Sequence, residues 1–284
     1  MLEIKNLTYA YNSAATPVLN DVSVSMGGGG VYGLLGANGE GKSTLLYLIM
    51  GDLKPRNGSV TWDGTPTANR RPSTLSDIFL VPEELSLPDV SIMQYARLNA
   101  SLYPRFSYED LDKYMRLFNC NDKLTFNSMS MGQRKKAFIA YALAANTPLL
   151  LMDEPTNGLD IPGKGEFRRV IAESDNNRRT IVISTHQVRD LDNVLTHVVM
   201  LANHRILLKN SLRDIEQRFV FEFVNTVPES PDIIYSEPVP GGYQIVRRRT
   251  PDCAPILPDA FPQVNLESMF NLAYNNPRAF ISNL

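Results

Sequence analysis

Hydrophobic and polar residues alternate through the first part of the chain, in LEIKNLTYAY at 2–11 and in VLNDVSVSM at 18–26. Alternation with a period of two is typical of strands that bury one face. A short apolar run at 31–35 then meets a glycine-rich stretch and the apolar segment STLLYLIM. That order predicts a strand, a loop and a helix. Further strands are expected within GSVTWDG at 58–64 and at 78–81, where Pro82 ends the run.

The pattern changes near residue 91. SIMQYARLNASLY and SYEDLDKYMRLF show amphipathic helical spacing on either side of Pro104, which predicts a helical insert. Helices are then expected at 133–145, 162–174 and 188–195, and strands at 149–153, 180–185, 197–201 and 205–210. This alternation predicts a mainly parallel sheet with helices on both faces. Beyond Arg218, proline-rich β-like runs and the helical segment LESMFNLAY predict a small C-terminal α+β appendage at 219–284.

Composition excludes several classes of function. The 284 residues include 28 Lys and Arg against 30 Asp and Glu, so no charge excess indicates nucleic acid as a partner. Cys120 and Cys253 lie far apart without other metal ligands at suitable spacing, which favours free thiols in a reducing, cytosolic compartment. The first residues lack the order of a signal peptide, and no apolar run approaches about 18 residues, so no membrane span is expected.

Residues 36–43, GANGEGKS, fit the phosphate-loop pattern G-x-x-x-x-G-K-[ST]. The glycines let backbone N–H groups turn toward phosphate oxygens, Lys42 reaches the β- and γ-phosphates, and the Ser43 hydroxyl ligates Mg²⁺. The alternative is a glycine-rich turn that binds nothing, which the preceding strand and the following helix disfavour. The residues expected to contact ATP are Gly36, Ala37, Asn38, Gly39, Glu40, Gly41, Lys42, Ser43 and Thr44.

Two acidic residues end the apolar strand PLLLMDEP, at the edge of the sheet beside this loop. Asp153 is expected to hold Mg²⁺, directly or through water, and Glu154 to take a proton from attacking water. Alone, such a pair more often marks a turn that ends a strand. Together with the phosphate loop, it predicts a catalytic site.

The stretch MSMGQ at 129–133 predicts a second anion site. Ser130 and Gly132 stand at the start of a strong helix, where unpaired backbone donors favour an anion.

With these motifs, the chain resembles the nucleotide-binding subunit of ATP-binding cassette (ABC) transporters over about residues 1–218. GANGEGKST resembles Walker A, MSMGQ the signature usually written LSGGQ, LLLMDE Walker B, NGLD the D-loop and STHQ the H-loop, in the family's order. The resemblance implies a P-loop NTPase α/β core with an antiparallel β subdomain near the N-terminus and a helical subdomain at about 84–135. It also implies ATP and Mg²⁺ as cofactors.

The same resemblance suggests further site residues. Tyr11 would stack on adenine, and His186 would contact the γ-phosphate and orient the attack, which makes Glu154, His186 and Lys42 the expected catalytic set. The signature residues Ser130, Gly132 and Gln133 would serve the ATP of a partner chain, and Asp160 would meet that partner. Taken alone, Tyr11 would be a packing residue, His186 a structural histidine and Asp160 a turn cap.

Three positions depart from the family pattern. Met131 replaces the first signature glycine, and His204 replaces a glycine that the family often has in a turn. Glu83 stands where the Q-loop usually has glutamine; its carboxylate can ligate Mg²⁺ but, when ionised, cannot donate to the attacking water.

The resemblance also implies partners and a location. Two identical or related cassettes would form an ATP-bound homodimer or heterodimer, attached to transmembrane subunits at the cytoplasmic face of the membrane through the helical insert and the Q-loop. Glu83 and EPTNGLD are more similar to exporters with separately encoded membrane subunits than to importers. One alternative is a soluble ABC ATPase of translation, repair or cluster assembly; another is a regulatory nucleotide-binding module without turnover. The single cassette and the two cysteines disfavour the first, and Glu154 disfavours the second.

Overall fold

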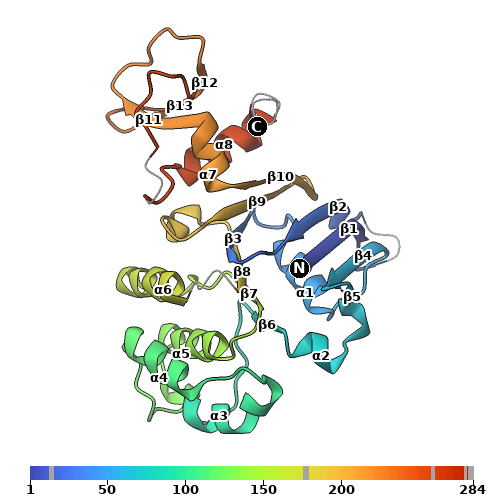
Figure 1. Ribbon diagram of the computed structural model, residues 1–284. Helices are drawn as coiled ribbons and strands as arrows, with labels where there is room; N and C mark the ends of the chain where they lie inside the picture. The colour runs from blue at the N-terminus through green and yellow to red at the C-terminus, as the bar shows by residue number, and fades with distance from the viewer. Residues whose placement is uncertain (13–15, 175–178, 257–259, 278–279, 281–284) are drawn as a thin grey trace.

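A six-stranded sheet runs through the middle of the protein in the computed structural model, which describes residues 1–12, 16–174, 179–256, 260–277 and 280 (Figure 1). Its strand order is β10-β9-β3-β8-β7-β6, parallel throughout except for the antiparallel edge pair β10 and β9. The strands are β3 (Gly30–Leu35), β6 (Ile78–Val81), β7 (Leu149–Asp153), β8 (Thr180–Thr185), β9 (His197–Ala202) and β10 (Arg205–Ser211). This confirms the predicted α/β fold with a mainly parallel sheet.

The strands β3, β7 and β8 in the middle of this sheet are buried on both faces, which explains their apolar character. Along β7, Leu149 and Leu151 enter one apolar core, whereas Leu150 and Met152 enter the core on the opposite face. The first core contains α1 (Lys42–Met50) and a four-stranded antiparallel sheet of order β2-β1-β4-β5. Those strands are β1 (Leu2–Tyr9), β2 (Leu19–Met26), β4 (Asn57–Trp62) and β5 (Thr65–Pro66). This is the antiparallel subdomain that the resemblance implied.

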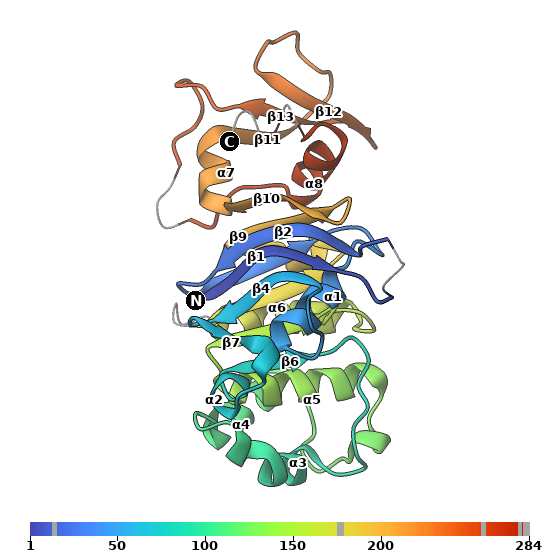
Figure 2. The same cartoon turned by 90° about the vertical axis from the view of Figure 1, so that its right-hand side faces the viewer.

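The helical insert lies at one end of the molecule, below the sheets in Figure 2. It comprises α3 (Ile92–Asn99), α4 (Tyr108–Leu117) and the start of α5 (Met131–Ala144), whose buried side packs against the second core together with α6 (Ile161–Ser174). Serine caps define the first residues of the three insert helices: the Ser91, Ser107 and Ser130 hydroxyls each accept a bond from the backbone N–H three residues on. Short elements connect these parts: α2 (Pro72–Leu75), η1 (Thr67–Asn69), η2 (Ala100–Leu102) and η3 (Phe126–Ser128).

The C-terminal part lies at the opposite end of the molecule (Figure 1). It follows α7 (Leu212–Arg218) and contains a three-stranded antiparallel sheet of order β11-β13-β12 and the helix α8 (Leu266–Asn275). The strands are β11 (Phe219–Val224), β12 (Ile233–Val239) and β13 (Gly242–Arg248). Buried residues of α8, among them Leu266 and Met269, belong to the same apolar core as α5 and α6, so this part is docked onto the rest of the chain.

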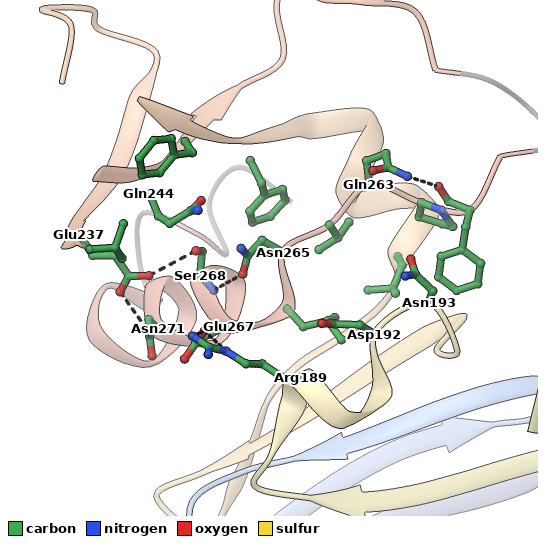
Figure 3. Close-up of a pocket in the computed structure, with 18 of the residues that line it drawn as sticks. Arg189, Asp192, Asn193, Glu237, Gln244, Gln263, Asn265, Glu267, Ser268 and Asn271 are labelled. Carbon is green, nitrogen blue, oxygen red and sulfur yellow. Dashed lines mark hydrogen bonds and ion pairs between the residues drawn. The ribbon is translucent and has the colours of Figure 1, made fainter. Parts of the chain in front are cut away.

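A cavity of about 700 Å³ lies where the C-terminal part meets the 3₁₀ turn η4 (Val188–Leu191). Figure 3 shows its polar lining: Arg189 pairs with Glu267, and Glu237 accepts hydrogen bonds from Ser268 and Asn271. These charged groups are therefore already partnered within the chain.

The predicted helix at 188–195 is wrong. Only the turn η4 forms there, because Asp192 leaves the helical region with ψ of 134° and Asn193 is left-handed with φ of 60°. This bend lets the Thr196 N–H pair with the Val31 carbonyl at the start of β3. Within the described residues, no helix combines the length and the apolar character needed to cross a bilayer.

Candidate nucleotide site

The strand order determines which chain segments meet at the site. Strand β8 lies between β3 and β7, so the phosphate loop after Leu35, the segment after Thr185 and the carboxylates at 153–154 all reach the same edge of the sheet. Binding sites of open α/β sheets form at this carboxyl edge. The sequence predicted that the loop and the acidic pair lie side by side, and the structure inserts β8 between them.

Glycines shape the phosphate loop at two points. A Cβ on Gly36 would lie 2.6 Å from the carbonyl oxygen of Leu201, and Gly41 has φ of 101°, a left-handed conformation at the N-cap of α1. The Lys42 ammonium folds back over this loop and donates to the carbonyls of Gly36 at 2.9 Å and Ala37 at 3.2 Å. The loop thus holds a buried cation at the N-terminal end of a helix, where phosphate is favoured.

A cavity of about 550 Å³ opens above the loop. Its lining comprises Tyr11, Val18, Asn38, Gly39, Gly41, Lys42, Ser43, Thr44, Glu83, Glu154, Asn157 and His186. Gly36, Ala37 and Glu40, expected to contact ATP, are not part of this lining. Gly36 and Ala37 instead hold Lys42, and the Glu40 carboxylate accepts from the backbone N–H of His204 at 3.0 Å.

The aromatic ring at the mouth of the cavity is open to solvent. Tyr11 is 61% exposed, its hydroxyl lies 3.0 Å from Thr44 Oγ1, and its ring packs edge-on against Tyr9. A tethered ring with a free face suits stacking on a planar base.

Glu154 is buried and held on all sides. Its side chain is 6% exposed, and its backbone has φ of 43°, an unusual value for a non-glycine residue. Thr185 Oγ1 donates to one carboxylate oxygen at 3.1 Å, and the other accepts from the His186 backbone N–H at 3.1 Å. His186 Nδ1 is 2.8 Å and Lys42 Nζ 3.6 Å from that second oxygen. These contacts fix the orientation of the carboxylate, and a proton acceptor held in one orientation suits general-base chemistry.

Asp153 places a buried carboxylate beside the loop. It is 2% exposed, and Ser184 Oγ donates to its carboxylate. Burial raises the pKa of Asp153, and the charges of Glu83 and Glu154 act in the same direction, while hydrogen bonds from Ser184 and Ser43 oppose the shift. Hydroxyl and carboxylate oxygens suit Mg²⁺. Within the described ranges, no group of three His, Cys, Asp or Glu side chains could hold a metal by itself, so phosphate and water oxygens would have to complete such a site.

Sequence reasoning missed a chain of amides across the cavity. Asn157 donates to Glu83 Oε1 at 2.9 Å and accepts from Gln187 Nε2 at 3.2 Å, and Gln187 Nε2 lies 3.4 Å from His186 Nε2. Asn157 and Gln187 lie inside the motifs already recognised, TNGLD and STHQ, but their partners depend on the strand order. Glu83 is therefore bound to the D-loop, at the rim of the cavity.

The signature residues lie outside this cavity. Ser130 and Gln133 form a reciprocal cap at the start of α5: the Gln133 N–H donates to Ser130 Oγ at 3.3 Å, and the Ser130 N–H donates to Gln133 Oε1 at 3.0 Å. Met131 is 67% exposed beside them. Asp160 caps α6 by accepting from the Gly163 N–H at 2.9 Å, the turn-cap alternative.

Comparison with known proteins agrees with these motifs. The family model for ABC transporters matches residues 19–157. The chain is 30% identical over 221 residues to a putative ABC transporter ATP-binding protein of Listeria monocytogenes, covering 73% of this chain and 81% of that protein. It is 29% identical over 215 residues to the lantibiotic transport ATP-binding protein SrtF of Streptococcus pyogenes, covering 74% and 90%.

Solved structures show the same fold. The structure of an ATP-binding subunit of an ABC transporter superposes with a TM-score of 0.67 at 28% identity, covering 76% of this chain and 92% of that chain. A dimeric bacterial ABC transporter cassette has a TM-score of 0.66 at 22% identity, covering 75% and 99%. The chain belongs to the family of ABC transporter ATP-binding proteins, and it is an ATP-binding ATPase with the P-loop α/β fold.

Proposed function

We propose that this ATPase powers transport, in the direction of export, through a separately encoded transmembrane subunit. Relatives that the chain covers over most of their own length, such as SrtF at 90%, are ATP-binding proteins, which supports a separate membrane partner. The similarity of Glu83 and EPTNGLD to exporters supports export, as does the similarity of the chain to the Nod factor export ATP-binding protein I of Cupriavidus pinatubonensis, at 28% identity over 222 residues. The chain would then act at the cytoplasmic face, attached through the helical insert and the Glu83 segment.

The separation of the signature from the nucleotide cavity is the observation that carries the mechanism. Ser130, Gly132 and Gln133 do not line the cavity of their own chain, so we assign them to the ATP of a second cassette, identical or related. Asp160 would lie at the interface of that dimer. Two ATP molecules would be enclosed, each between one chain's phosphate loop and the other's signature.

Within each ATP site, we assign a different role to each group of residues. Tyr11 stacks on adenine, and the backbone N–H groups of Gly39 to Thr44, with Lys42, bind the phosphates. Ser43 and Asp153, with Glu83 at the rim, would hold Mg²⁺, which neutralises phosphate charge when bound. Glu154 takes the proton from attacking water. His186 holds that carboxylate and contacts the γ-phosphate.

We propose residues 1–218 as the ABC ATPase domain, with the helical subdomain at about 84–135, and 219–284 as a small C-terminal α+β appendage. The solved cassettes support this boundary, because they are matched over 92% and 99% of their own lengths by only 76% and 75% of this chain.

Co-purification from membranes tests the transport proposal. A tagged chain, solubilised from native membranes in mild detergent with ATP, should carry a multi-span membrane protein at fixed stoichiometry. A Glu154→Gln chain should retain that partner, since the docking residues are unchanged. Recovery of the chain only as a free protein, in both nucleotide states, would favour a soluble ABC ATPase instead.

A further inference from the structure

Lys135 is a buried cation that the mechanism above does not use. It lies in the second turn of α5, two residues after the signature MSMGQ, and it is 4% exposed although the helix begins at the surface. Burying an ammonium is costly unless hydrogen bonds satisfy it. Its Nζ donates to the carbonyl oxygens of Glu154 at 2.9 Å and Asn157 at 3.1 Å.

Both acceptors belong to the turn that carries the proposed general base. The Glu154 carbonyl also accepts the Asn157 N–H at 3.2 Å, so Lys135 closes the turn from 154 to 157. The carbonyl and the carboxylate of Glu154 are parts of one residue with an unusual φ of 43°. A shift of the Lys135 ammonium would therefore change where the carboxylate points.

Two residues of the signature, Met131 and Gly132, lie against Gly158, the residue that follows this turn. A Cβ on Gly158 would lie 2.2 Å from Met131 Cε, and a Cβ on Gly132 would lie 3.1 Å from the Gly158 carbonyl oxygen. The start of α5 thus contacts 154–158 through Met131, Gly132 and Lys135. Because the side chain of Asn157 also reaches Glu83 and Gln187, this turn connects the signature with both neighbouring loops.

Three nearby carboxylates favour the charged form of Lys135, against the effect of burial. Burial lowers the pKa of Lys135, while the carboxylates of Glu83, Glu154 and Asp153 oppose that shift. Only backbone carbonyls accept its hydrogen bonds among the described residues, so its contribution is directional: it fixes the position of the turn.

We propose that Lys135 is a positioning residue that links the signature to the Glu154 of the same chain, so that a signature bound to the partner's ATP sets the geometry of its own chain's base. This inference rests on the proposed assembly in trans. It makes the two ATP sites of a dimer dependent on each other through α5.

The test compares Lys135→Met, which removes the donors, with Lys135→Gln, which retains a shorter amide donor. Lys136→Met is the matched control, since Lys136 is the next residue of α5 and pairs with Glu166 at 2.9 Å, away from the turn. For each variant, monomer affinity for a fluorescent ATP analogue, ATP-driven dimerisation in a Glu154→Gln background, kcat and KM are measured.

We expect Lys135→Met to lower kcat about 100-fold, the scale of a base displaced by about 1 Å, with ATP affinity and dimerisation within about two-fold of the parent. Lys135→Gln should recover part of the lost kcat, and Lys136→Met should keep the kcat of the parent.

An unchanged kcat in Lys135→Met would overturn the inference. A parallel loss of ATP binding, dimerisation and kcat would also overturn it, because that result indicates structural support alone. If Lys135→Met does not fold, Lys135→Gln decides by the same criteria. Failure of the Glu154→Gln protein with Lys135 intact to dimerise with ATP would instead contradict the assembly in trans.

Discussion

The phosphate loop and the signature were both predicted to bind anions, yet they form opposite kinds of surface. The loop borders a cavity of about 550 Å³ in which Lys42 and Glu154 are already buried and partnered. The signature is an exposed helix start, with Met131 67% open to solvent and the Ser130 hydroxyl engaged in its own cap. The residues proposed for phosphate binding and water activation therefore line or border one cavity of the chain, whereas the predicted second anion site faces outward.

The largest expected effect comes from removing the base inside the cavity. Glu154→Gln keeps the size of the side chain but loses its proton affinity, so kcat should fall by about 10²–10⁴-fold, while ATP still binds and the dimer accumulates. Phosphate release under saturating ATP measures this. Glu84→Gln, an exposed neighbour of Glu83, is the control and should turn over like the parent. Normal hydrolysis by Glu154→Gln would refute its assignment as base.

A smaller loss is expected from the residue that orients the base. His186→Ala removes the ring 2.8 Å from Glu154 but leaves the backbone N–H that also binds that carboxylate, so kcat should fall by about 100-fold. His197→Ala is the matched control, because His197 stacks on Tyr32 at 4.4 Å and does not line the cavity. Equal effects of the two substitutions would show that His186 acts only through stability.

The smallest effect is expected from substitution of Tyr11, at the mouth of the cavity. Tyr11→Ala removes the exposed ring, and loss of base stacking, about 1–3 kcal/mol, should weaken ATP binding about tenfold with little change in kcat. Tyr11→Phe keeps the ring but loses the hydroxyl beside Thr44, so its affinity should stay close to that of the parent. Titration of both variants with a fluorescent ATP analogue distinguishes stacking from packing. Unchanged affinity in Tyr11→Ala would leave Tyr11 as a packing residue.

Local elements of the fold could be predicted from the sequence, but the pairing of distant strands could not. Strands such as β6 and β7 follow directly from apolar runs ended by proline or by acidic residues. The position of β8 between β3 and β7 could not be predicted, because strand pairing is non-local and no spacing encodes it. For the same reason the hydrogen bonds of Glu154 to Thr185 and His186 appear only in the fold.

The burial of individual side chains could not be predicted from the sequence either. A lysine in RKKAF is expected at the surface of a helix, and only the packing of α5 against the 154–157 turn reveals that Lys135 is enclosed. The helix expected at 188–195 failed because its apolar spacing also fits a bent segment whose Leu191 and Leu195 are both fully buried. Periodicity alone does not distinguish these two conformations.

Completion of the ATP site in trans can be tested by sedimentation of Glu154→Gln with saturating ATP, alone and combined with Ser130→Arg. We expect Glu154→Gln to become a dimer when ATP is added, whereas the double variant stays a monomer that binds ATP with the parent's affinity, because Ser130 serves the nucleotide of the partner. A double variant that still dimerises, or that loses ATP binding as an isolated monomer, would contradict completion of the site in trans.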